Sequence, residues 1–151
     1  MSWYCENETK SVEPSAVHGG TVYEQIGVVE STSGTEFGVF DPDLILKPDE
    51  VGSRLQLELS VLLPKHTGVE PKDCAKGIYP NEENPAGFQD HGLCGEAVDK
   101  TKIKEGWYTA RIDTGDGILR AGGNKDQMPT VSLGDLISVR AVRIDVLNTG
   151  E

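Results

Sequence analysis

Four side chains that could ligate a metal lie in one polar stretch of the sequence. They are His66, Cys74, His91 and Cys94. Zinc takes four tetrahedral ligands, and two cysteines with two histidines are one of its standard sets. The spacing His91-x-x-Cys94 puts two ligands on one turn of the chain, with glycines beside them to let it bend. These residue types predict a structural zinc site, since four protein ligands leave no position for a reacting water.

The same cysteines allow two other arrangements. The stretch has no Cys-x-x-Cys pair, and the gap from His66 to Cys74 is long for a metal site. Cys74 and Cys94 could form a disulfide, or both could be unpaired thiols in a loop organised by Tyr79, Phe88 and several prolines. We rank unpaired thiols first, the disulfide second and zinc third. Counting thiols with and without a chelator distinguishes the three arrangements.

Arginine and aromatic side chains gather near the C-terminus and form a second candidate site. They are Trp107, Tyr108, Arg111, Arg140 and Arg143. A basic, aromatic sheet face is a common way to bind single-stranded nucleic acid. The alternative is cross-strand ion pairing with Glu58, Asp113 and Asp145. We favour the ion pairs, because nearby acids cancel most of the positive charge.

Carboxylate pairs elsewhere do not indicate catalysis. Asp113-Thr-Gly-Asp116-Gly lacks the spacing of a calcium loop and predicts a hairpin turn, because Asp-Gly suits the positive φ of a type I′ turn. Asp41 and Asp43 flank a proline in an acidic region, where we expect solvated side chains. The sequence has neither a nucleophile elbow nor a phosphate-binding glycine loop. We therefore expect a protein that is not an enzyme.

Charge and composition limit the partners and the location. The chain has 151 residues and a net charge of -11. Residues 1–50 contribute ten acids against two bases, and this negative field repels phosphate backbones. No apolar run is long enough for a membrane span, and the first residues do not resemble a signal peptide. We expect a soluble protein, cytoplasmic or part of a virion, in a reducing compartment.

Alternating apolar residues predict strands and little helix. Leu55, Leu57, Leu59 and Val61 alternate with polar residues, so one face of this strand should lie in the core. Residues 1–19 are expected to be an N-terminal arm, followed by a single β domain over residues 20–151. The strands expected in that domain are 21–30, 36–40, 54–63, 107–113, 118–121 and 136–147, the last with a β-bulge where its alternation slips.

Residues 64–105 separate the third expected strand from the fourth and show no periodicity. We expect an irregular insertion that makes intermolecular contacts and is dispensable for folding of the barrel. The chain is therefore expected to be all-β, either a small barrel or a β-sandwich of five to six strands. The spacing of the strands resembles an OB-fold, in which the first strand is long and glycine-broken.

These features together predict a non-enzymatic β module that works by protein–protein contact. Its partners would be other subunits of a larger assembly, copies of itself included, and a virion is one assembly of this kind. The alternatives are an OB-like nucleic-acid-binding protein and a small metal-dependent enzyme that uses the insertion. No cofactor is expected apart from the candidate zinc.

Overall fold

The computed structural model describes residues 4–66, 68–128 and 131–149. This part of the chain is nearly all β, as predicted, but it contains eleven strands rather than five or six. The elements in order are β1 (Cys5–His18), β2 (Thr21–Ser31), β3 (Glu36–Asp41), the short 3-10 helix η1 (Pro48–Glu50), β4 (Arg54–Leu62), β5 (Val69–Pro71), β6 (Gly77–Tyr79), β7 (Gly92–Lys104), β8 (Trp107–Asp113), β9 (Ile118–Asn124), β10 (Leu136–Arg140) and β11 (Arg143–Thr149).

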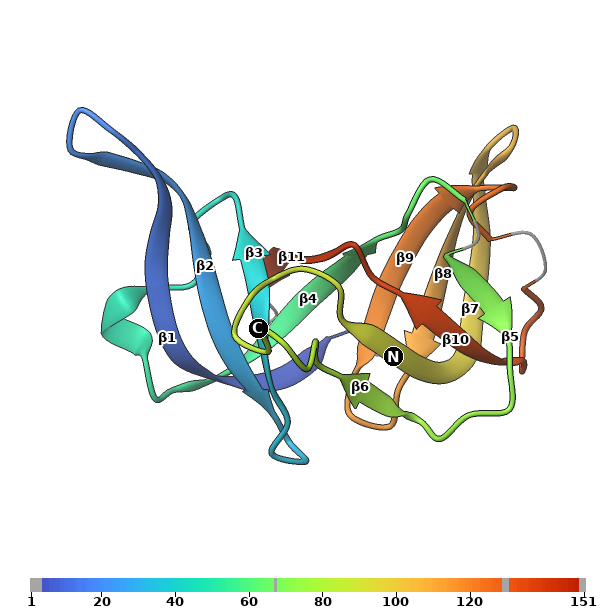
Figure 1. Cartoon of the computed structure of the whole chain (residues 1–151). Coiled ribbons are helices and arrows are strands. Elements are labelled where there is room, and N and C mark those ends of the chain that lie inside the picture. The colour runs from blue at the N-terminus through green and yellow to red at the C-terminus, as the bar shows by residue number, and fades with distance from the viewer. Residues whose placement is uncertain (1–3, 67, 129–130, 150–151) are drawn as a thin grey trace.

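The strands form two lobes that share β4 (Figure 1). In the first lobe, pairing runs β1-β2-β3-β11-β4, and a further pairing of β1 with β4 closes these five strands into a ring. β11 pairs with β3 in parallel and with β4 in antiparallel orientation. The ring thus joins the two ends of the described chain, because β1 and β11 both belong to it.

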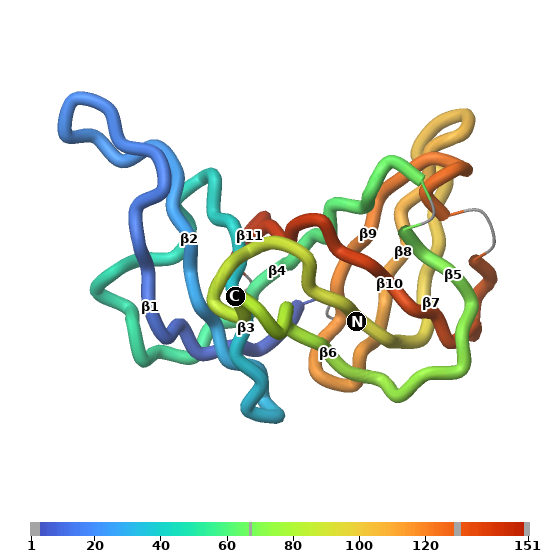
Figure 2. The backbone as a smooth tube through the Cα atoms, in the orientation of Figure 1, coloured from blue at the N-terminus to red at the C-terminus, as the bar shows by residue number. Residues whose placement is uncertain are grey.

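The second lobe is built on the far end of β4. Ser60–Leu62 pairs in parallel with Arg120–Gly122 of β9, and the sheet continues β9-β8-β7-β10-β5 with β6 beside β7. Every strand of this lobe lies between β4 and β11 in the sequence. The backbone trace in Figure 2 shows the chain leaving the first lobe along β4 and returning through β10 into β11.

The apolar face predicted from the alternation in β4 is buried. Leu57 and Leu59 are inaccessible to solvent, and Val61 is nearly so. They belong to an apolar core that runs through both lobes, with Val29, Phe37 and Val39 from the first and Leu93, Ile112 and Ile137 from the second. The predicted register of β4 is therefore confirmed.

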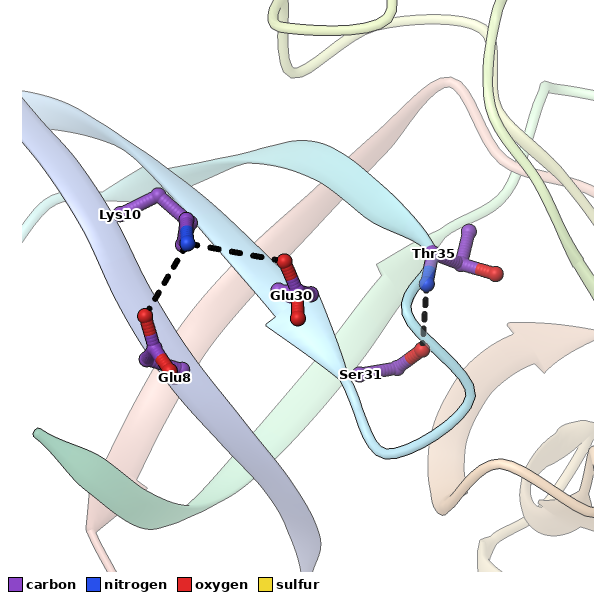
Figure 3. A network of polar contacts seen from close by, with 5 residues as sticks. All are labelled: Glu8, Lys10, Glu30, Ser31 and Thr35. Atoms are coloured by element: carbon purple, nitrogen blue, oxygen red, sulfur yellow. Dashed lines mark hydrogen bonds and ion pairs between the residues drawn. The ribbon is translucent and has the colours of Figure 1, made fainter. Parts of the chain in front are cut away.

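The N-terminal arm expected over residues 1–19 is wrong for the described part of that range. Cys5–His18 is a strand that pairs with both β2 and β4. Its polar sequence concealed the strand, because Asn7 and Thr9 occupy inward positions that usually carry apolar side chains. Three register shifts in the β1–β2 pairing further disturb the alternation. On the outer surface, Lys10 contacts Glu8 at 3.1 Å and Glu30 of β2 at 3.6 Å (Figure 3).

The irregular insertion expected over residues 64–105 is also wrong. This range contains β5, β6 and the whole of β7, and it contributes buried side chains to the core. Residues 64–105 follow β4, which is the fourth strand of the chain and not the third as expected. The count was one short because β1 lies in the range expected to be an arm.

The last predicted strand, with its bulge, is two strands in different lobes. β10 pairs with β7 in the second lobe, and β11 pairs with β4 in the first. The slip in the alternation falls at Ala141 and Val142, where the chain crosses between lobes (Figure 1). The change in the alternation of apolar residues thus marked the point where the chain crosses from one lobe to the other.

Candidate interaction site

An apolar pocket of about 280 Å³ opens beside the hairpin of β1 and β2. The hairpin forms one wall, and the connection from β3 to β4 forms the other. The lining residues are Val12, Pro14, Val22, Gln25, Leu44, Leu46, Lys47 and Pro48. An apolar hollow with few polar groups suits a partner's apolar side chain.

A buried carboxylate holds the second wall in place. Asp41, which is fully buried, accepts hydrogen bonds from the backbone N–H groups of Ile45 (2.9 Å) and Leu46 (2.8 Å). The side-chain amide of Gln25 links this carboxylate, at 2.7 Å, to the carbonyl of Leu46, at 2.6 Å. These bonds fold the connection back over β2, with Leu44 at a φ of 55°.

The Asp41 network was not predicted from the sequence. We expected Asp41 and Asp43 to be solvated, and for Asp41 this is wrong, while Asp43 is exposed. The motif Asp-Pro-Asp between two apolar runs is a local signal for such a turn, because an aspartate can accept hydrogen bonds from nearby backbone N–H groups. Sequence patterns do not show whether this aspartate is buried.

Large apolar side chains are exposed near the end of the same hairpin. Val17 and Tyr23 retain 57% and 55% of their accessible surface. The β1–β2 hairpin that carries both residues also supplies one wall of the pocket, and it projects from the first lobe (Figure 1). An apolar pocket and exposed aromatic and aliphatic groups on one projecting hairpin are typical of a contact surface.

The four predicted zinc ligands do not form a metal site in this structure. Cys74 and Cys94 form a disulfide, so neither sulfur is a thiolate ligand. His66 is exposed, and His91 uses both ring nitrogens in hydrogen bonds. Over residues 4–66, 68–128 and 131–149, no group of three or more His, Cys, Asp and Glu side chains could hold a metal ion. The zinc prediction has no support from this arrangement.

The structure shows the disulfide that we ranked second, and ranking the unpaired thiols first was wrong for Cys74 and Cys94. We expected a reducing compartment because the cysteine count is odd and a chain of this size needs no disulfide, and the disulfide argues against that expectation, since disulfides persist in oxidising environments. Cys5 is the remaining cysteine and is buried. Burial raises the pKa of its thiol to about 12, and the nearby Asp116 carboxylate adds to this rise. Cys5 therefore remains a protonated, inert thiol.

Removing the disulfide should lower the free energy of unfolding by about 3 kcal/mol, because the bond closes a loop whose ends are 20 residues apart. Urea unfolding of the Cys74→Ser/Cys94→Ser variant measures this loss, and wild-type protein in reductant should show the same loss. Denatured, unreduced wild type should expose one thiol, that of Cys5. Three thiols without reductant, or thiols that appear only after chelation, would contradict the disulfide.

His91 fastens a loop of the second lobe onto the first. Its Nδ1 accepts the backbone N–H of Asn81 at 2.9 Å, so the proton of the neutral ring lies on Nε2. Nε2 donates to the carbonyls of Gly87 at 2.7 Å and Gly38 at 3.0 Å. Gly38 belongs to β3, and its N–H donates to the carbonyl of Pro85 at 2.9 Å. The loop over residues 80–91 thus satisfies both backbone groups of Gly38.

Acid should loosen this attachment. Burial lowers the pKa of His91 below its ordinary value, so the unfolded chain binds more protons than the native one as the pH falls below about 6.5. The contribution of neutral His91 to the free energy of unfolding is therefore complete above that pH and declines as the pH falls below it. Urea unfolding between pH 7.5 and 5 should show falling stability, with a shallower slope in His91→Gln. His66→Gln, at an exposed position, is the control and should keep the wild-type slope. Equal slopes in all three proteins would refute this role.

Asp116 joins the two lobes at a second point. The turn between β8 and β9 is the hairpin predicted from Asp-Gly, and Asp116 in it accepts hydrogen bonds from Thr32 (2.9 Å) and from the hydroxyl (2.6 Å) and N–H (3.0 Å) of Ser33. Burial alone would raise the pKa of Asp116, but hydrogen bonds from the β2–β3 turn lower it overall. A polar hollow of about 360 Å³ lies beside this contact, lined partly by Lys76 and Tyr79. Asp116 therefore acts as a structural link between the lobes.

The predicted arginine and aromatic site is dispersed. Trp107, Tyr108 and Arg111 lie on β8, whereas Arg140 lies on β10 and Arg143 on β11. Arg143 donates to Asp145 at 2.6 and 3.0 Å and covers the ring of Phe40 at 4.5 Å. Arg143 and Asp145 lie two residues apart on the same strand, so this pair is not one of the cross-strand ion pairs that we favoured, whereas Arg120 with Glu58, at 4.0 Å, is a cross-strand pair. The five residues do not form one basic face.

Comparison with known proteins does not place the chain in a family. It matches no protein-family model, and no curated protein shows significant similarity to it. The described part of the chain has no helix with the length and apolar character needed to cross a membrane.

Proposed function

We propose that this chain is a non-enzymatic β module that works by protein–protein contact as a subunit of a larger assembly. The observation that carries the proposal is the apolar pocket of the first lobe, with Val17 and Tyr23 exposed on the hairpin that forms one of its walls. The wall of the pocket is fixed by the buried Asp41 network, so the surface is preorganised for a partner. Preorganised surfaces bind at a lower entropic cost than flexible ones.

Photo-cross-linking in the cells of origin tests this function. A photoreactive p-benzoylphenylalanine replaces Tyr23, and the matched control replaces Tyr79, whose side chain is 48% exposed and lies away from the pocket. We expect mass spectrometry to identify protein adducts from position 23 and none of the same adducts from position 79. An absence of protein adducts at position 23, or the same adducts from both positions, would contradict the proposal.

We also propose that the first lobe is an OB-like barrel. Support comes from its five-strand ring, in which the first strand pairs with both the second and the fourth. OB-folds bind oligonucleotides on the face of their second and third strands. Here the loop over residues 80–91 packs on the third strand, β3, and its Phe88 contacts Phe40 of that strand with 5.3 Å between the ring centroids. This cover favours protein contact over nucleic-acid binding, and a salt series with single-stranded DNA separates the two functions.

A further inference from the structure

A second projecting hairpin complements the pocket in both charge and apolarity. Residues 100–107, here named the lysine tip, form the end of the β7–β8 hairpin and contain Lys100, Lys102 and Lys104. Ile103 and Trp107 in the lysine tip are 59% and 38% exposed. The lysine tip therefore offers large apolar side chains among ammonium groups, although the chain as a whole is acidic.

The rim of the pocket has the opposite charge. Two exposed carboxylates, Asp43 and Asp49, lie in the connection from β3 to β4 that forms one wall, each next in sequence to a lining residue, and residues 1–50 together carry ten acids against two bases. Among the described residues that line the pocket, Lys47 is the only base, and its ammonium group donates to the carbonyl of Leu44 at 3.0 Å. Opposite potentials on two surfaces steer them together and fix their orientation.

The tip and the pocket of one molecule cannot meet, because the β1–β2 hairpin and the β7–β8 hairpin lie at opposite ends of the molecule (Figure 1). We propose that the lysine tip of one copy docks in the apolar pocket of another copy, with Ile103 or Trp107 as the apolar anchor. The contact joins two different surfaces, so copies associate head to tail into a ring or a filament. This inference rests on the proposed function, since it names the partner as a second copy of this chain.

The charged lysine side chains of the lysine tip are accessible to a partner. Lys102 contacts Glu105 at 2.9 Å, but both side chains are more than half exposed, and such pairs contribute little. Lys100 lies over the ring of Tyr108 at 5.0 Å and donates to the carbonyl of Val131. Lys104 is exposed. Docking on the rim therefore gives Lys102 and Lys104 new carboxylate partners without breaking a buried contact.

Sedimentation velocity of the purified full chain tests this inference. Wild type should associate as its concentration rises toward about 1 mM, and added salt should weaken the association. Ile103→Ser should weaken association about tenfold, since it removes an apolar anchor. Leu62→Ser, at a position that is 45% exposed on the shared strand β4, is the matched control and should leave association unchanged.

Charge reversal gives a sharper test. The rim variant Asp43→Lys/Asp49→Lys and the tip variant Lys102→Glu/Lys104→Glu should each be monomeric, and a mixture of the two should associate. All four side chains are exposed, so folding should be unaffected, and thermal melting checks this. A monomeric wild type at every concentration, or a mixture that stays monomeric while wild type associates, would overturn the head-to-tail contact. A monomeric wild type with protein adducts at position 23 would leave the proposed function intact and identify a different partner.

Discussion

Replacing residues 64–105 with a short glycine-serine link is expected to abolish cooperative folding. The replacement removes β5, β6 and the whole of β7, and β7 is the strand that pairs with both β8 and β10. It also removes buried apolar side chains, Val69 and Leu93 among them, and the disulfide. Circular dichroism and urea unfolding should show no single transition. A native-like transition would restore the sequence-based expectation that this range is dispensable.

A point substitution isolates the part of this effect that belongs to the loop over residues 80–91. A Cβ added at Gly38 would lie 2.2 Å from the carbonyl oxygen of Gly87 and 2.3 Å from that of Ala86, so the loop could not dock on β3 unchanged. Gly38→Ala should cost about 1–3 kcal/mol of unfolding free energy. Gly92→Ala is the matched control, because its added Cβ meets nothing closer than 3.8 Å. Equal stability of the two variants would show that the loop does not support β3.

Leu57→Ala is expected to destabilise the fold more than Gly38→Ala does. Leu57 is fully buried on β4, the strand that both lobes share, so truncation leaves a cavity at their common element. The loss should be about 2–5 kcal/mol of unfolding free energy, measured by urea unfolding. Gln56→Ala, at the exposed neighbouring position, should change stability little. A larger loss from Gln56→Ala than from Leu57→Ala would mean that the strand is turned by one residue.

Much of the β structure was predictable because half-buried strands leave a period of two in the sequence. The strands at 54–62 and 107–113 were found in this way, as was the buried face of Leu57. The strand at 21–31 was found from its β-branched residues, and the strands at 36–41 and 118–124 from the turns that precede them. The prediction failed at β1, where inward positions carry Asn7 and Thr9. It failed again at β5 and β6, which have only three residues each and are too short to show a period.

The candidate contact surfaces depended more strongly on tertiary structure. The sequence by itself determined an acidic, nearly all-β chain, the Asp-Gly hairpin and the three possible states of Cys74 and Cys94. Only the fold decided among those states, because it brings the two cysteines together. Only the fold buried Asp41, shaped the pocket beside β1 and β2, and placed the lysine tip at the far end of the molecule. Local patterns record which face of a strand is buried, but pockets and contacts arise from segments distant in sequence, whose meeting no local pattern encodes.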